Sequence, residues 1–205
     1  MTTITAQHIP GFGTVLGSDK QISNDRRDFI NLYPKWVIAK SGEWAIGVCG
    51  AGRTLHLINA HNEKLFHEVK NIYDLTNRMM ELLVDDDTHF VREEGYPRHI
   101  AGSFLVATPD CVWNIDCSLT ATEIPTGEFV STGSGSEYAL GAEFVAREHI
   151  KDPIEITRKA IEAAKKFDSG TGGDIWICKM HRVKHKNQKV IYPLKEKNKT
   201  KVTIA

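Results

Sequence analysis

The chain has 205 residues, and its 26 lysines and arginines balance its 26 aspartates and glutamates. This length suits one domain with a substantial core, and the balanced charge gives no overall field that would attract nucleic acid or a membrane surface. The opening residues have no basic region followed by an apolar run, and no later stretch is long and apolar enough to span a bilayer. We therefore expect a single cytoplasmic domain over residues 1–205, in which residues 181–205 form a basic C-terminal extension.

The cysteines and histidines do not indicate a metal site. Four cysteines are scattered without CxxC spacing, which favours free and mostly buried thiols over a disulfide framework or a zinc knuckle. The nine histidines are likewise dispersed. We expect neither a metal ion nor a cofactor.

The first half of the chain predicts two β-hairpins. In residues 3–18, β-branched residues alternate on both sides of Pro10 and Gly11, which are typical turn residues. The stretches 35–40 and 44–49 flank a Ser-Gly-Glu turn and predict a second hairpin. Four strands therefore precede the first helix.

Two pairs of helices are predicted from the spacing of apolar residues. One helix is expected to begin after the glycines at 50–52 and to reach about residue 66, and a second covers 72–83. A second pair is expected over 136–150 and from Pro153 to about residue 164, since proline is favoured in the first turn of a helix.

The remaining strands complete the expected fold. Residues 103–108 and 111–116 predict a further hairpin, 128–132 a single strand, and 174–180 and 190–192 two last strands. The order is strands, two helices, strands, two helices and strands. It predicts an α+β fold, a four-layer αββα sandwich in which two antiparallel sheets carry a helix pair on each outer face.

Glycines before a helix invite a nucleotide-binding interpretation, and those at 50–52 follow a predicted strand. However, Leu55 stands where a dinucleotide fingerprint has its third glycine, and the strand belongs to a hairpin. The glycine clusters at 133–135 and 170–173 lack the lysine of a phosphate loop. The sequence therefore disfavours nucleotide binding.

Thr2 is a candidate nucleophile because it directly follows the initiator methionine, and a small second residue permits removal of Met1. The exposed threonine would then carry a free α-amine, whose unperturbed pKa is about 7.7 to 8. Such an amine can take the proton of its own hydroxyl, so that nucleophile and base are one residue. Alone this feature is weak, because many proteins begin with Met-Thr.

The pattern behind Thr2 resembles the β subunits of proteasomes and the related HslV-type bacterial peptidase, which are N-terminal-nucleophile (Ntn) hydrolases. The resemblance runs from about Thr2 to Met180. TTITA followed by VLGSD is similar to the opening hairpin of the family, and CGAG to its AGG segment. STGSGSEYALG and KKFDSGTGGDI resemble its GSG and DxxSGG segments. This resemblance implies a catalytic set made of Thr2, Asp19, Lys35, Gly50, Ser134, Asp168 and Thr171.

Within this set, the resemblance implies that Asp19 and Lys35 tune the nucleophile, that the Gly50 N–H binds the oxyanion, and that the last three residues orient the amine. Thr171 replaces the serine of the family and keeps a hydroxyl. The segment between Asp19 and Lys35 departs from the family pattern, so Lys20 and Lys40 remain alternatives for the catalytic lysine. The implied substrate pocket is apolar and consists of Ile22, Ser23, Tyr33, Val37, Val48 and Gly52.

The resemblance implies a threonine endopeptidase that hydrolyses polypeptides inside a ring or other closed homo-oligomer, with an unfoldase ATPase as a further partner. Three alternatives stay open. The chain could be a noncatalytic ring subunit that keeps Met1, or a small-molecule Ntn amidase. The third alternative, a nucleic-acid-associated scaffold that binds through the basic C-terminal extension, is disfavoured because basic termini are commonly only solvated.

Overall fold

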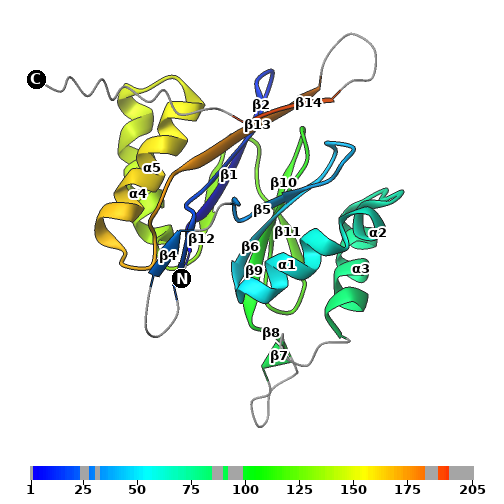
Figure 1. Ribbon diagram of the computed structural model, residues 1–205. Helices are drawn as coiled ribbons and strands as arrows, with labels where there is room; N and C mark the ends of the chain where they lie inside the picture. The colour runs from blue at the N-terminus through cyan, green and yellow to red at the C-terminus, as the bar shows by residue number, and fades with distance from the viewer. Residues whose placement is uncertain are drawn as a thin grey trace, which may run out of the picture.

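The protein is described by a computed structural model, which covers residues 2–23, 28–30, 33–84, 90–91, 99–182 and 189–193. Two five-stranded antiparallel sheets lie between two layers of helices (Figure 1). The predicted four-layer αββα sandwich is thereby confirmed. Most of the predicted basic extension lies outside the described residues.

The first sheet contains the N-terminal hairpin. Its strand order is β12-β1-β2-β13-β14, with bounds β1 Ile4–Ile9, β2 Gly13–Ser18, β12 Phe129–Thr132, β13 Trp176–Arg182 and β14 Lys189–Pro193. β1 and β2 form the hairpin that the β-branched alternation predicts, with Ile4 opposite Ser18. This register brings the start of β1 next to the end of β2.

The second sheet contains the second predicted hairpin and has the order β11-β10-β9-β6-β5. Its bounds are β5 Trp36–Ile38, β6 Ala45–Gly50, β9 Gly102–Ala107, β10 Val112–Ile115 and β11 Ala121–Glu123. Two short ribbons accompany the sheets: β3 Gln21–Ser23 with β4 Asp28–Ile30, and β7 Phe90–Val91 with β8 His99–Ile100. The ribbons and β11 were not expected from the sequence.

The helices form the two outer layers, on opposite sides of the sheets in Figure 1. α1 Gly52–Ala60, α2 Asn62–Phe66 and α3 Ile72–Val84 cover the second sheet, and α4 Ser136–His149 and α5 Pro153–Phe167 cover the first. The helix predicted to reach residue 66 is divided, because His61 leaves the helical conformation with φ −101° and ψ 20°. α5 begins as predicted at Pro153, and the Asp152 side chain caps it by accepting from the Ile154 N–H.

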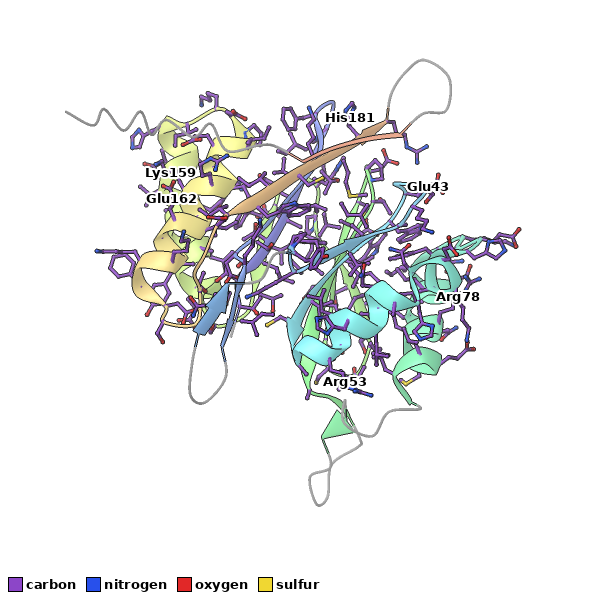
Figure 2. The ribbon with its side chains drawn as sticks, viewed as in Figure 1. Glu43, Arg53, Arg78, Lys159, Glu162 and His181 are labelled. Atoms are coloured by element: carbon purple, nitrogen blue, oxygen red, sulfur yellow. The ribbon has the colours of Figure 1, made fainter. Side chains whose placement is uncertain are left out.

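Apolar side chains fill the space between the layers. Ile4, Leu16 and Leu105 are fully buried in a core cluster that both sheets share, and a larger cluster joins the second sheet to α1–α3. Figure 2 shows the sticks concentrated there, whereas the labelled Lys159 and Glu162, which form a 2.8 Å ion pair, lie on the outer helical layer. The sandwich is therefore held by burial of apolar surface, with charged residues outside.

The cysteines are free thiols, but they are not all buried. Cys178 is buried, Cys49 and Cys111 are partly exposed, and Cys117 is exposed. Among the described residues, no group of three or more histidine, cysteine or acidic side chains could hold a metal ion. Within the same part of the chain, no helix has the length and apolar character required to cross a membrane.

Candidate active site

Thr2 lies two residues before the start of β1, and only 4% of its surface is exposed. Its carbonyl oxygen faces the loop between β12 and α4, where the Gly135 N–H lies 3.5 Å away. Gly133 in this loop has a φ of +107°, and a Cβ atom there would lie 1.9 Å from the Thr2 carbonyl oxygen. Only glycine meets both demands, so Gly133 allows the loop to close over Thr2.

Lys35 and Asp19 form a buried ion pair beside the Thr2 hydroxyl. The Lys35 Nζ atom lies 2.8 Å from Asp19 Oδ1 and 2.9 Å from Thr2 Oγ1. The lysine and aspartate side chains are 5% and 0% exposed, unlike the solvated ion pairs that contribute little. Asp19 follows β2 and Lys35 precedes β5, so each sheet supplies one partner. Trp36 Nε1 donates a 2.9 Å hydrogen bond to the Gly17 carbonyl and joins the two sheets beside this pair.

Backbone donors surround the Asp19 carboxylate. Oδ1 accepts from the Thr3 N–H at 3.0 Å, and Oδ2 accepts from the N–H groups of Gln21 at 3.0 Å and Gly172 at 3.1 Å. A fully buried charge requires such partners, because burying it unpaired would be costly. The carboxylate is therefore fixed, and it fixes the position of Lys35.

The pKa of Lys35 is set by two opposing influences. Burial lowers this pKa, and the attraction to Asp19 opposes the effect without cancelling it. As a cation, Lys35 favours the deprotonated form of a neighbouring hydroxyl and so lowers the pKa of that hydroxyl. The geometry directs this effect to Thr2.

A second polar cluster surrounds the nitrogen of Thr2. The Thr2 N–H donates to Ser134 Oγ at 3.2 Å, and the Ser134 hydroxyl donates to Asp168 Oδ2 at 2.7 Å. The Thr171 hydroxyl donates to the same carboxylate oxygen at 2.5 Å. The structure thus brings all three expected supporting residues together at the Thr2 nitrogen.

Asp168 is ionised at neutral pH. Burial is the largest influence and raises its pKa, but hydrogen bonds from Thr171, Ser134 and the Gly170 N–H together lower the pKa below the ordinary value. An ionised carboxylate can only accept hydrogen bonds, and Ser134 has a single hydroxyl proton to donate. The Ser134 oxygen therefore accepts the hydrogen bond of the Thr2 N–H, and the Ser134 hydroxyl does not donate a hydrogen bond to the Thr2 nitrogen.

Gly50 ends β6 two residues before α1. Its φ of +135° and the 2.4 Å that would separate a Cβ atom from the Ala101 carbonyl oxygen both require glycine. In the first turn of α1 the Thr54 N–H donates to the Ala51 carbonyl at 3.0 Å, and Ala51 at the N-cap supplies no side-chain acceptor. Gly50 thus lies where backbone N–H groups create a positive potential next to Thr2.

A small cleft of about 70 Å³ opens beside Thr2, Lys35 and Gly50. Three of the expected pocket residues line it: Ile22, Val48 and Gly52. Gln21, Ala51 and Leu55 also line it and were not expected. Leu55 stands three residues after Gly52, which is the helical spacing that brings two residues to one face of α1.

The other expected pocket residues do not line this cleft. Val37 is 4% exposed and packs into the core beneath α1–α3, because β5 turns its side chain toward the helical layer. Tyr33 is 71% exposed and lies outside the set of lining residues. Ser23 belongs to β3, but its side chain is not among the described ones.

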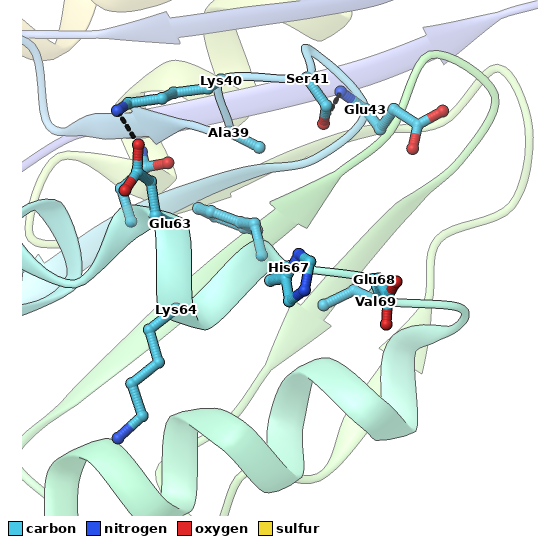
Figure 3. A pocket seen from close by; sticks show the side chains of 11 residues that line it. Ala39, Lys40, Ser41, Glu43, Glu63, Lys64, His67, Glu68 and Val69 are labelled. Carbon is cyan, nitrogen blue, oxygen red and sulfur yellow. Dashed lines mark hydrogen bonds and ion pairs between the residues drawn. The ribbon is translucent and has the colours of Figure 1, made fainter.

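A cavity of about 630 Å³ lies elsewhere, between the β5–β6 turn and α2 (Figure 3). The exposed side chains of Lys40 and Glu63 form an ion pair there, so Lys40 is engaged away from Thr2. Ser41 and His67 also line the cavity. Ser41 Oγ accepts from the Glu43 N–H at 3.3 Å, and no hydrogen bond within the described residues joins it to His67. This cavity therefore lacks a nucleophile in contact with a base.

Lys20, the other alternative for the catalytic lysine, has its N–H bonded to the Gly172 carbonyl at 3.1 Å. Lys35 is the lysine whose hydrogen bond to the Thr2 hydroxyl the structure records. Sequence reasoning missed Thr3, Gly133 and Gln21. They lie within two residues of the expected Thr2, Ser134 and Asp19, respectively. The alternation in residues 3–18 could have given the face on which Thr3 lies, but not its partner.

Comparison by sequence finds no relative, since no family model and no curated protein matches the chain. Comparison by structure finds BPH of Thiobacillus denitrificans, a bacterial proteasome homologue, with a TM-score of 0.70 and 19% identity over 86% of this chain and 96% of that chain. BPH in complex with epoxomicin gives a TM-score of 0.69 and 17% identity over the same shares. At so low an identity the likeness establishes the fold. The chain therefore has the fold of the proteasome-like Ntn hydrolases.

Proposed function

We propose that the chain is a threonine endopeptidase subunit of a proteasome-like assembly, and that Thr2 hydrolyses peptide bonds once Met1 has been removed. One observation carries this proposal. The Thr2 hydroxyl contacts Lys35 at 2.9 Å while the Thr2 nitrogen contacts Ser134 at 3.2 Å. Once Met1 is removed this nitrogen is an amine, so that the nucleophile, its base and the Lys35 cation lie together at Thr2, as this kind of catalysis requires.

In the proposed reaction, the Thr2 hydroxyl oxygen attacks the carbonyl carbon of the peptide bond, and its proton passes to the Thr2 amine. The Gly50 N–H donates to the oxyanion that forms. Loss of one such donor typically raises the barrier by about 3 to 4 kcal/mol. The C–N bond then breaks, the departing amine takes the proton from the Thr2 amine, and an ester to Thr2 remains. Water activated by the same amine hydrolyses this ester and restores the hydroxyl.

The polar clusters support these roles. Lys35 donates to the hydroxyl, so a lone pair of the oxygen is polarised while its proton stays available to the amine. Ser134 accepts from the Thr2 nitrogen because its own proton goes to Asp168. The amine lone pair then remains available for the hydroxyl proton.

The proposal includes assembly into a ring or other closed homo-oligomer in the cytoplasm, which admits unfolded polypeptides, with an unfoldase ATPase as partner. Exposed apolar side chains on the helical layer formed by α4 and α5 support association with other copies. They are Tyr138, Leu140, Phe144 and Val145 of α4 and Phe167 of α5. The comparison with a bacterial proteasome homologue points the same way.

The cleft beside Thr2 supports a preference for a small apolar residue before the cut bond. Ile22, Val48 and Leu55 line it, and its volume is about 70 Å³. The same small volume favours a second candidate, a small-molecule amidase, because the catalytic groups would serve any amide. A panel of fluorogenic peptides and small acyl amides separates the two. Cleavage only after acidic or basic residues would contradict the apolar preference.

Intact mass spectrometry tests the proposal first. The mature protein should lack the mass of one methionine, and treatment with an epoxyketone should add one inhibitor mass at Thr2. Wild type should hydrolyse fluorogenic peptides, whereas Thr2→Ala should neither hydrolyse them nor gain the inhibitor mass. Retention of Met1 with no hydrolysis would instead favour a noncatalytic ring subunit.

A further inference from the structure

Thr3, the neighbour of the proposed nucleophile, takes part in the same polar cluster. Its hydroxyl oxygen lies 2.6 Å from the Thr171 hydroxyl oxygen. Both residues are buried, with 0% and 3% of their surfaces exposed. A hydrogen bond between two buried hydroxyls is shielded from competition by water.

The direction of this hydrogen bond follows from proton counting. Thr171 has one hydroxyl proton and donates it to Asp168 Oδ2 at 2.5 Å. Its oxygen must therefore accept from the Thr3 hydroxyl. The result is a directed chain from Thr3 through Thr171 to the Asp168 carboxylate.

The adjacent residues Thr2 and Thr3 are thus connected to the Asp168 carboxylate by two separate chains of hydrogen bonds. Thr2 reaches Asp168 through Ser134, and Thr3 reaches it through Thr171. The Thr3 N–H additionally donates to Asp19 Oδ1 at 3.0 Å, in the other cluster. Thr3 therefore links both polar clusters at the residue next to Thr2.

Gly135 provides the space that the hydroxyl pair needs. A Cβ atom at this position would lie 2.2 Å from Thr3 Oγ1 and 2.8 Å from Thr171 Oγ1. Real Cβ atoms do not approach buried oxygens so closely. The glycine at the start of α4 and the two hydroxyls therefore form one fitted arrangement.

We propose that Thr3 is a positioning residue for catalysis. Its hydroxyl orients Thr171 and, through Thr171, the Asp168 carboxylate. Ser134, which is hydrogen-bonded to this carboxylate, then holds the Thr2 amine with its lone pair toward the Thr2 hydroxyl. This inference rests on the proposed function, because it concerns the geometry of the amine as a base. It predicts that the Thr3 hydroxyl, and not merely the volume of its side chain, determines the turnover rate.

The chain offers a matched control in Thr5. It lies two residues after Thr3, on the same face of the extended chain, and is also 0% exposed. Its hydroxyl has no hydrogen-bond partner among the described residues. Thr3→Val and Thr5→Val are the same change of shape at equal burial, but only the first removes a hydrogen bond.

The experiment compares wild type, Thr3→Val, Thr3→Ser and Thr5→Val in steady-state hydrolysis of a fluorogenic peptide, with thermal unfolding to confirm that each variant is folded. Thr3→Val should lower kcat about five- to tenfold, the effect of one lost hydrogen bond, with KM unchanged. Thr3→Ser keeps the hydroxyl and loses a buried methyl group, so it should retain kcat within about twofold even where its stability falls. Thr5→Val should match wild type.

Two results would overturn the inference in distinguishable ways. If wild type hydrolyses peptides and Thr3→Val keeps the same kcat as Thr5→Val, the hydroxyl does not position the amine, although the proposed function stands. A kcat that follows the melting temperature across the four proteins, with Thr3→Ser the slowest, would give Thr3 a purely structural role. If wild type neither hydrolyses peptides nor gains an epoxyketone mass, the proposed function fails and this inference fails with it.

Discussion

Lys35 Nζ lies 2.9 Å from Thr2 Oγ1, although the two residues are 33 positions apart and precede strands of different sheets. The contact forms where the start of β1 meets the start of β5 across the interface between the sheets. Both residues are buried, so the lysine charge acts on the hydroxyl with little screening by solvent. The interface between the sheets therefore creates the reactivity proposed for Thr2.

Replacement of Lys35 should impair both hydrolysis and stability. Lys35→Met preserves much of the side-chain volume but leaves Asp19 charged and buried without a cation, which costs about 3 to 5 kcal/mol of unfolding free energy. Loss of the charge at the Thr2 hydroxyl should lower kcat about a hundredfold or more. Denaturant unfolding and peptide hydrolysis, corrected for the folded fraction, measure the two effects.

Lys40→Met is the control for this change. Lys40 pairs with Glu63, but both side chains are more than two-thirds exposed, at 73% and 74%. We expect neither kcat nor the unfolding midpoint to change measurably, because exposed pairs contribute little. Equal loss of activity in the two variants would contradict the assignment of Lys35.

Gly133 should tolerate no side chain. Gly133→Ala would put a methyl group 1.9 Å from the Thr2 carbonyl oxygen at a φ of +107°. We expect a loss of about 3 kcal/mol or more of unfolding free energy and nearly complete loss of hydrolysis, because the Thr2 backbone must move.

Gly141→Ala provides the opposite expectation within the same region. Gly141 lies inside α4, and a Cβ atom there would meet nothing within 4 Å. The substitution should stabilise the protein by about 0.5 to 1 kcal/mol, because alanine is the better helix former. Urea unfolding of both variants checks the signs, and a stable, active Gly133→Ala would contradict the close approach at Thr2.

Most of the fold was predictable because long elements have a regular pattern. The alternation over residues 3–18 predicts the β1–β2 hairpin, and Pro153 marks the start of α5. By contrast, β11 is the three-residue segment Ala-Thr-Glu, with no buried alternation to indicate a strand. The break at His61 depends on a single backbone conformation, which the apolar spacing of α1 and α2 does not reveal.

The site was less predictable from pattern alone. Asp19, Lys35 and Asp168 were identified through a family resemblance, since no periodicity relates residues that meet only through tertiary packing. The pocket expectation was mixed for the same reason. Val37 and Val48 are buried valines of the same sheet and belong to the same core cluster, but only Val48 also lines the cleft.

Asp168 should make stability depend on acid pH. Its pKa is lower in the folded protein than in the unfolded chain, so its contribution to stability is complete above the unfolded value and is lost as pH falls through the folded value. The unfolding free energy of wild type should therefore decrease below about pH 4. Asp168→Asn cannot titrate, so its deficit relative to wild type should shrink as the pH falls.

Ser134→Ala and Thr171→Val test the cause of this shift. Each removes a hydrogen bond that lowers the Asp168 pKa, so the acid-dependent loss should move to higher pH than in wild type. Urea unfolding at a series of pH values measures all four proteins. If the unfolding free energies of wild type and Asp168→Asn fell in parallel as the pH decreases, another carboxyl group would be responsible for the loss of stability in acid.

Val48 should determine which residue fits the cleft. It is 5% exposed and lines the 70 Å³ space beside Thr2. Val48→Ala removes two methyl groups from this wall, so the cleft should accept a larger apolar side chain before the cut bond. We expect the ratio of kcat/KM for leucine over alanine substrates to rise about tenfold, a typical effect of a small volume change in an apolar pocket.

The same substitution should cost about 0.5 to 3 kcal/mol of unfolding free energy, because Val48 also belongs to the core beneath α1–α3. Val145→Ala is the matched control, since Val145 is 56% exposed on α4, far along the chain from the cleft. It should leave the substrate ratio unchanged, because Val145 does not line the cleft. A ratio that stays constant in Val48→Ala, while stability falls as expected, would show that the substrate side chain binds outside the cleft that Val48 lines.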